Sequence, residues 1–136
     1  MDLFEKHLVV KKSSLPRAGK GLFTKVDIPK DSLIVEYKGK ITTWKEVEHH
    51  NGTNGYIFYV TRNHVVDAEK TKKALARYAN DARGFVRVKG IQNNAIYAIK
   101  KGKPYIQSTK KISAGSEIFV EYGKEYWDTM KENRDI

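Results

Sequence analysis

The chain has 136 residues, which suffice for one domain with a buried core and are too few for two. It lacks cysteine, so a disulfide framework and a thiolate metal site are excluded, and its 4 histidines do not show the spacing of metal ligands. Lys and Arg number 26 against 16 Asp and Glu, and the resulting net charge of +10 favours contact with a polyanion without identifying it.

The beginning of the chain, Met1 to Lys6, carries acidic residues and no apolar core, which argues against a secretory signal or a transit peptide. No apolar run in the sequence approaches the roughly 20 residues that a membrane span needs. We therefore expect a soluble intracellular protein without membrane contact.

Short apolar runs separated by turn residues predict strands in the first third of the chain. In order, these runs are Leu8 to Val10, Leu22-Phe23, Val26 to Ile28 and Leu33 to Tyr37. The segment 13–21, which is rich in glycine and serine, is expected to form the turn between the first two runs.

A helix and a hairpin are expected next. Thr43 and Glu46 form a capping box, which predicts a short helix that runs towards His50. The segments 56–60 and 64–67 are crowded with β-branched and aromatic residues, which predicts that they form a hairpin.

The alanine-rich segment 70–79 has the propensity and the partial apolar face of a second helix, which Asn80-Asp81 ends. A second hairpin is expected from the apolar runs 95–99 and 105–108, with 101–104 as its turn. Both predictions rest on local pattern alone.

The last predicted strand begins after Gly115 and ends at Tyr122-Gly123, and Tyr126 and Trp127 follow it closely. Strands and helices do not alternate as in dinucleotide-binding folds. Gly19 and Gly21 alone are therefore only a weak indication of a dinucleotide-binding site. The pattern as a whole predicts one mainly β domain made of several small sheets.

Five short motifs, taken together and in this order, resemble those of SET-domain protein-lysine methyltransferases. They are Ala18 to Phe23, Tyr56-Ile57-Phe58, Asp67-Ala68, Arg77 to Asp81, and Gly115 to Ile118 with Glu121-Tyr122-Gly123. The resemblance covers residues 7–127 and leaves 128–136 as a C-terminal tail that is helical or flexible. The size and the missing cysteine-rich flanks are most similar to the minimal viral and prokaryotic members.

This resemblance implies a single SET domain of residues 1–136, a mainly β fold with short helices and several small twisted sheets. It also implies a C-terminal pseudoknot, in which the end of the chain threads under a preceding loop and brings the Asn80 region beside Tyr122. The implied activity is methyl transfer from S-adenosylmethionine to the ε-amine of a lysine in a protein, without a metal.

The resemblance also implies the cofactor-binding residues. Glycine in the loop lets the backbone approach the methionine part of the cofactor, and the amide of Asn80 can donate and accept. Arg77 either orients that loop, pairs with the cofactor carboxylate or is solvated. The full set is Ala18, Gly19, Lys20, Gly21, Tyr56, Arg77, Asn80, Asp81 and Trp127.

The chain departs from the family pattern at two places. Asp81 stands where a histidine is common, which is tolerable if that residue serves the adenine through its backbone and weakens cofactor binding if the histidine side chain matters. The usual Cys-x-Pro-Asn is missing as well, and Asn94 is the residue that looks like its closing asparagine.

Methyl transfer to lysine needs a neutral amine, whose unperturbed pKa is about 10.4. Desolvation in an aromatic channel and the nearby sulfonium charge lower that pKa, so no dedicated base is required. By resemblance Tyr122 is the catalytic residue, whose hydroxyl orients the reacting groups, and Tyr56, Tyr122 and Tyr126 line the lysine channel. Tyr126 and Trp127 are equally plausible as core anchors.

The substrate is expected to be a histone or another chromosomal protein. A basic enzyme repels basic tails unless acidic side chains form a local groove, and the candidates are Glu46, Glu48, Glu117, Glu121, Glu125 and Asp128. A substrate already bound to nucleic acid suits the basic surface better. The location would be cytoplasmic for a prokaryotic chain and nuclear for one acting on chromatin. The protein is expected to be a monomer or a homodimer. The alternative is a basic β-rich nucleic-acid-binding module or an inactive SET relative.

Overall fold

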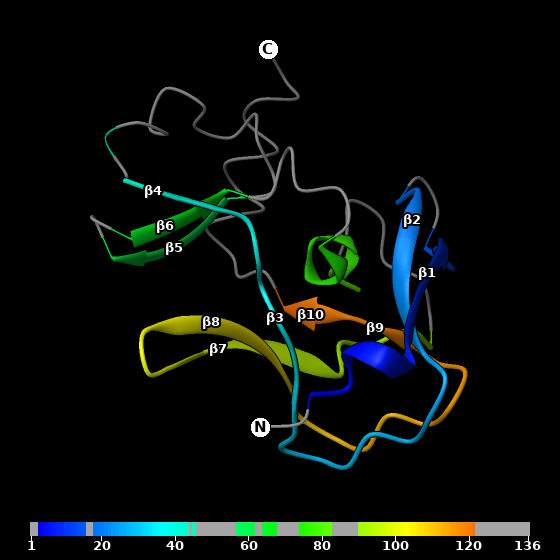
Figure 1. The fold of residues 1–136 in the computed structure, drawn as a ribbon. Helices are drawn as coiled ribbons and strands as arrows, with labels where there is room; N and C mark the ends of the chain where they lie inside the picture. The colour runs from blue at the N-terminus through cyan, green and yellow to red at the C-terminus, as the bar shows by residue number, and fades with distance from the viewer. Residues whose placement is uncertain are drawn as a thin grey trace.

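Short strands in three small sheets are the main secondary structure of the described chain in the computed structural model (Figure 1). The structure describes residues 3–15, 18–43, 45, 57–61, 64–67, 74–82 and 90–121. Two single turns of 3-10 helix accompany the strands, η1 (Glu5–His7) and η3 (Leu75–Tyr78). The predicted mainly β fold with several small sheets is confirmed.

The first sheet has the order β1-β2-β9. β1 (Leu8–Lys12) and β2 (Lys20–Thr24) are antiparallel, and β9 (Glu117–Ile118) joins the other edge of β2. This pairing places Ile118 opposite Leu22, and both side chains are fully buried. The sheet therefore joins the beginning of the chain to its last described strands.

The second sheet has the order β10-β7-β8-β3. β7 (Ala95–Lys100) and β8 (Lys103–Ser108) form the predicted second hairpin, β3 (Leu33–Glu36) lies beside β8, and β10 (Val120–Glu121) runs parallel to β7. The turn is shorter than expected: it consists of Lys101-Gly102, both with positive φ, so the expected turn residues Lys103 and Pro104 belong to β8.

The third sheet has the order β4-β6-β5. β5 (Ile57–Thr61) and β6 (His64–Asp67) form the first predicted hairpin, and β4 (Lys40–Thr42), which was not predicted, pairs with the other edge of β6. The predicted helix from Thr43 to His50 lies almost wholly outside the described residues.

The predicted helix 70–79 is wrong in its described part, which contains only the single turn η3. Ala74 and Ala79 flank this turn with extended backbone, at ψ 118° and 126°. The side chains of Ala76 and Ala79 are buried in the core, so packing outweighs the helical propensity of this segment. Within the described residues, no helix is long and apolar enough to cross a membrane.

The core lies between the first two sheets and η3. Its fully buried members come from distant parts of the chain, since β2, β3, β8, β9 and β10 each contribute. The largest of them include Leu22, Ile28, Ile34, Val35, Ile106, Ile112, Ile118 and Val120.

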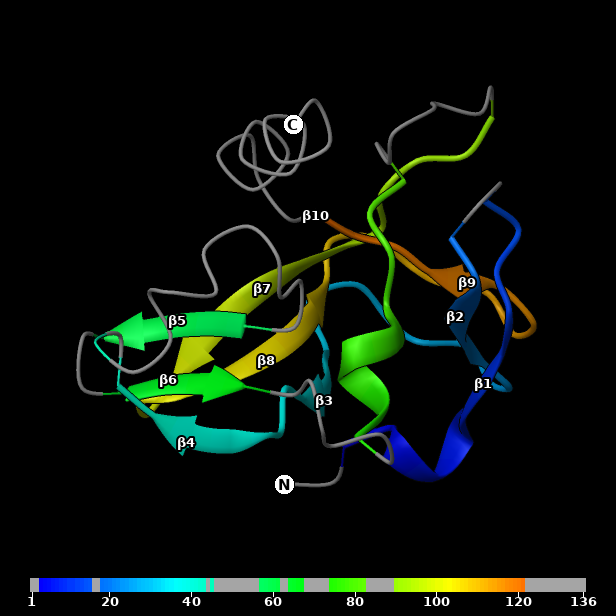
Figure 2. The same ribbon diagram turned by 90° about the horizontal axis from the view of Figure 1, so that it is seen from above.

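The last predicted strand is divided at Phe119 into β9 and β10, which belong to different sheets. Phe119 forms a parallel bridge with Asn80, and the Val120 amide donates to the Asn80 carbonyl at 2.8 Å. The chain that leaves η3 thus lies across the junction of β9 and β10, as Figure 2 shows. This crossing is the expected knot-like arrangement up to Glu121.

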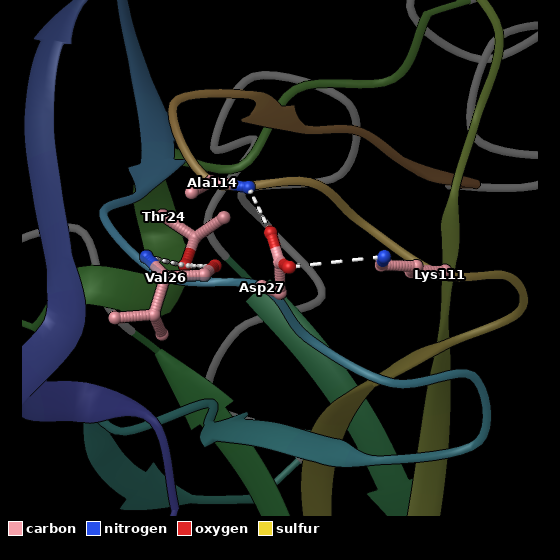
Figure 3. Close-up of polar contacts among 5 residues, drawn as sticks. All are labelled: Thr24, Val26, Asp27, Lys111 and Ala114. Atoms are coloured by element: carbon pink, nitrogen blue, oxygen red, sulfur yellow. Dashed lines mark hydrogen bonds and ion pairs between the residues drawn. The ribbon is translucent and has the colours of Figure 1, made fainter.

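Polar contacts of Asp27, which we call the polar staple, connect the segment after β2 to the segment before β9 (Figure 3). Asp27 Oδ1 accepts from the Ala114 amide at 2.8 Å, and its Oδ2 lies 3.7 Å from Lys111 Nζ. Thr24 Oγ1 donates to the Val26 carbonyl at 2.7 Å and accepts from the Val26 amide at 3.2 Å. The two Asp27 contacts connect the segment that follows β2 to residues 111–114, which precede β9.

Candidate functional site

Three segments meet where the chain crosses itself: residues 13–21, residues 80–82 after η3, and residues 117–120 of β9 and β10. We call 13–21 the glycine loop, although its last two residues, Lys20 and Gly21, already belong to β2. The loop is closed by its own backbone, since the Ser13 amide donates to the Gly19 carbonyl at 2.8 Å. The crossing holds the second and third segments together. Residues far apart in sequence are thereby placed in one site.

Glu117 is the carboxylate at the centre of this meeting point, and its residue is only 5% exposed. Its Oε1 accepts from the Ser14 amide at 2.9 Å and from Ser14 Oγ at 2.7 Å. Its Oε2 accepts from Ser13 Oγ at 2.7 Å and lies 3.5 Å from Asn80 Nδ2. Buried polar groups need such partners, because an unpaired buried charge is costly.

The expected contribution of Glu117 to an acidic substrate groove is wrong, because its side chain is buried and engaged by the two serines. Of the other acids in that groove, Glu121 is exposed and the remaining four lie outside the described residues. Ser13, Ser14 and Glu117 were not predicted as site residues. The available signal was a carboxylate inside the apolar run of β9 and β10, which requires buried donors.

Asn80 connects the glycine loop to the crossing. Its side-chain Nδ2 donates to the Lys20 carbonyl at 3.0 Å, and its backbone carbonyl accepts from Val120. The predicted site residues Lys20 and Asn80 are therefore brought into direct contact. Gly19 and Gly21 flank this contact.

The two glycines of the loop differ in what surrounds them. Gly19 has φ +68°, and among the described residues no heavy atom lies within 4 Å of the position that a Cβ would take. Gly21 is buried, and a Cβ there would contact Glu117 Oε2 and lie 2.9 Å from Glu117 Cδ and 3.1 Å from Ser13 Cβ. Gly19 is open for a ligand to approach, whereas Gly21 makes room for Glu117.

We expect Gly21→Ala to lower the free energy of unfolding by about 1–3 kcal/mol, because the added methyl overlaps the Glu117 carboxylate. Chemical denaturation measures this loss. In the Glu117→Ala background most of the cost of Gly21→Ala should disappear, because the overlapping atoms are gone. Equal costs in the two backgrounds would contradict the observed contact.

A small apolar cluster supports the same meeting point. Leu15, Ala82 and Phe119 are buried together, and Ala18 and Ile91 pack against them. Each of the three segments contributes to this cluster, so polar and apolar contacts both hold the loop against the crossing. Phe119 therefore lies in this apolar cluster.

The side chain of Asp81 is almost completely buried, at 2% exposure of the residue, and accepts from Asn93 Nδ2 at 2.9 Å. Asn93 Oδ1 in turn accepts from the Ala82 amide at 2.7 Å. This pair joins the two described ends of the chain that flank residues 83–89. The carboxylate of Asp81 therefore faces the protein interior.

Asn94 bridges the two short strands with its side-chain amide. Its Nδ2 donates to the Glu117 carbonyl at 3.0 Å, and its Oδ1 accepts from the Phe119 amide at 2.9 Å. Asn94 thus satisfies backbone groups at the point where β9 gives way to β10. Asn93, which was not predicted as a site residue, is bonded to Asp81 and Ala82.

Arg77 is partly buried on η3, and its guanidinium carbon lies 5.2 Å from the centre of the Tyr78 ring. The predicted residues Tyr56, Tyr122, Tyr126 and Trp127 lie outside the described residues, as does the side chain of Phe58. The described chain contains no group of acidic or histidine side chains that could hold a metal ion.

Comparison with known proteins identifies this arrangement. The family model described as the SET domain matches residues 19–123. None of the curated proteins that were compared matches the chain.

Two solved structures are similar in fold. One is a humanized mutant of the Chaetomium thermophilum Polycomb Repressive Complex 2 bound to the inhibitor GSK126, with 27% identity, a TM-score of 0.66, and coverage of 85% of this chain. The other is the methyltransferase domain of human PR domain-containing protein 2, with 20% identity, a TM-score of 0.63 and 87% coverage. The chain spans 15% of the first of these chains and 78% of the second. The match over residues 19–123, together with the crossing at Asn80 and Phe119, shows that this chain belongs to the SET domain family.

Proposed function

We propose that the chain is an S-adenosylmethionine-dependent methyltransferase that acts on the ε-amine of lysine in a protein. The observation that carries the proposal is the hydrogen bond from Asn80 to Lys20 in the glycine loop. Asn80 also forms the crossing with Phe119, which lies three residues before Tyr122 in sequence. In the SET family pattern, these segments are the ones that meet the cofactor. Membership of the family, which is shown by the match, supports the same reading.

The residues present fit this cofactor. The backbone of Gly19 is exposed, and the space that a Cβ would fill is open within the described residues. The Ser13 amide donates to the Gly19 carbonyl, and Asn80 Nδ2 donates to the carbonyl of the next residue, Lys20, so this backbone is held in place. Because the Asp81 carboxylate is bonded to Asn93, we assign to Asp81 a contribution through its backbone.

The remaining cofactor contacts follow from the resemblance. Trp127 would stack on the adenine, Tyr56 would line the cofactor site, and Arg77 would either orient the loop or pair with the cofactor carboxylate. When bound, S-adenosylmethionine would supply an electrophilic sulfonium methyl group for transfer to the lysine nitrogen.

The chain's own residues prepare the lysine for this reaction. Tyr56 and Tyr126 form an aromatic channel that excludes water and lowers the pKa of the entering amine. Tyr122 donates or accepts a hydrogen bond that orients the amine towards the methyl group. No side chain is assigned the role of a dedicated base.

Surface charge supports one substrate class. Three exposed lysines, Lys100, Lys101 and Lys103, stand at the tip of the β7–β8 hairpin, and Lys11 and Lys12 are exposed on β1. With a net charge of +10, the chain attracts polyanions and repels free basic peptides. We therefore propose a histone or another chromosomal protein that is bound to nucleic acid.

Activity on a DNA-bound chromosomal protein is expected to exceed activity on its free tail peptide several-fold at low salt. The advantage should shrink as salt is raised, because salt screens the attraction between lysines and phosphates. Initial rates on both substrates, measured across a salt series, check this. Equal rates at low and at high salt would remove the support for a nucleic-acid-bound substrate.

Calorimetric titration with S-adenosylmethionine, followed by transfer of a labelled methyl group to a panel of proteins, tests the proposed function. We expect saturable binding and label on protein. Binding of DNA without any binding of the cofactor would instead favour the second candidate, a basic nucleic-acid-binding module, which the exposed lysines support.

A further inference from the structure

Glu117 has a buried carboxylate on strand β9. Strand pairing uses only its backbone and does not need a charged side chain. Glu117 lies opposite Phe23 in the β2–β9 pair and next to the fully buried Ile118. An apolar side chain would fill such a position without the cost of desolvating a charge. A carboxylate, in contrast, accepts hydrogen bonds in defined directions. The donors that bind Glu117 therefore indicate its role.

One carboxylate oxygen anchors the beginning of the glycine loop. Oε1 accepts from both the amide and the hydroxyl of Ser14. The neighbouring Ser13 donates its hydroxyl to Oε2, accepts from the Leu15 amide, and donates its own amide to the Gly19 carbonyl. The position of Gly19 is therefore tied to the carboxylate through the backbone of Ser13.

The other oxygen faces Asn80. Asn80 Nδ2 carries two protons, and its acceptors are the Lys20 carbonyl at 3.0 Å and Glu117 Oε2 at 3.5 Å. Because the amide is planar, holding its nitrogen on this side fixes the direction in which Oδ1 points. Gly21 allows the arrangement, since any Cβ there would overlap the carboxylate.

We propose that Glu117 is a positioning residue, which holds the glycine loop and the Asn80 amide in one fixed arrangement before the cofactor arrives. The inference rests on the proposed function, because the ligand that meets both elements is S-adenosylmethionine. Glu117 itself acts through Ser13, Ser14 and Asn80 and does not touch the cofactor. Pre-organisation of this kind raises affinity by removing the cost of ordering the site on binding.

Glu117→Gln is the most informative variant, because it keeps the size of the side chain and one oxygen. That oxygen can retain the bonds from Ser14, while the new amide group presents protons to Asn80 Nδ2 where the carboxylate accepted. We expect the Kd for S-adenosylmethionine, measured by calorimetry, to rise about tenfold.

Asp27→Asn is the matched control. It makes the same change from carboxylate to amide in the polar staple of Figure 3, where Asp27 accepts from Ala114 and lies near Lys111. Its Kd for S-adenosylmethionine should stay within about twofold of the wild type, since a single exposed charge contributes little. An equal rise in both variants would assign the effect to general loss of charge or stability and overturn the proposal.

A second readout needs no cofactor. In the nuclear magnetic resonance spectrum of the free protein, the side-chain amide protons of Asn80 should exchange faster with solvent in Glu117→Gln and remain unchanged in Asp27→Asn. Unchanged exchange at Asn80, together with an unchanged Kd, would overturn the positioning role. A wild-type protein that binds no S-adenosylmethionine would refute the proposed function, while the exchange measurement would still decide whether Glu117 holds Asn80.

Ser14→Ala covers the case in which Glu117→Gln does not fold. Ser14 is exposed, and the substitution removes only the bond from its hydroxyl to Oε1. We expect a Kd about threefold higher, in the same direction as for Glu117→Gln. A Kd equal to that of the wild type would overturn the proposal.

Discussion

Replacing Tyr122 by phenylalanine is expected to lower the rate of methyl transfer about a hundredfold or more, the cost of losing orientation at a reacting centre. The aromatic ring remains, so the substitution removes only the hydroxyl to which the proposal assigns the orienting role. Affinity for S-adenosylmethionine should change less than about threefold, because one neutral hydrogen bond contributes little. Single-turnover rates and calorimetry measure the two quantities separately.

Tyr105→Phe is the matched control for this change. Tyr105 lies on β8, opposite Ala98, in a sheet position remote in sequence from the glycine loop and Asn80. The same loss of a hydroxyl there should leave the transfer rate within about twofold, as expected of a substitution away from the site. Full activity of the Tyr122→Phe variant would show that the catalytic assignment is wrong.

The largest effect on stability is expected for Ile118→Ala, at about 2–5 kcal/mol of the free energy of unfolding. Ile118 is fully buried and lies opposite Leu22, so truncation leaves a cavity between β2 and β9. The crossing at Phe119 follows directly and depends on this pairing. Urea denaturation, followed by the protein's tryptophan fluorescence, measures the loss.

Ile41→Ala makes the same truncation on β4, where Ile41 is 67% exposed. This substitution should change the free energy of unfolding by no more than about 0.5 kcal/mol, because little buried apolar area is lost. If the two substitutions destabilise the protein equally, the division between the core and the outer sheet is wrong.

The strands of the fold were largely predictable, because β-branched and aromatic residues mark them locally. Where prediction failed, long-range contacts decided the outcome. Ala74 and Ala79 adopt extended backbone against their helical propensity, and β4 has too few residues to show a pattern. The last strand divides at Phe119 because its amide and carbonyl bond to Asn94 and Ala95 instead of continuing one ladder.

The candidate site was predictable only in part, for the same reason. The glycine loop and Asn80 were identified through resemblance, but their contact at Lys20 spans 60 positions of sequence. Glu117 was predicted only as a candidate for an acidic groove. Local pattern did not reveal its partners Ser14 and Ser13, because they lie 103 and 104 positions away. The reason for glycine at position 21 likewise became visible only in three dimensions.

The most direct test of the central claim is mass spectrometry of a DNA-bound chromosomal protein after incubation with this chain and S-adenosylmethionine. The account predicts methyl groups on the ε-nitrogen of lysine and none after incubation with the Tyr122→Phe variant. Lysines that remain unmodified across a panel of such proteins, with a wild-type chain that is folded and saturated with the cofactor, would contradict it.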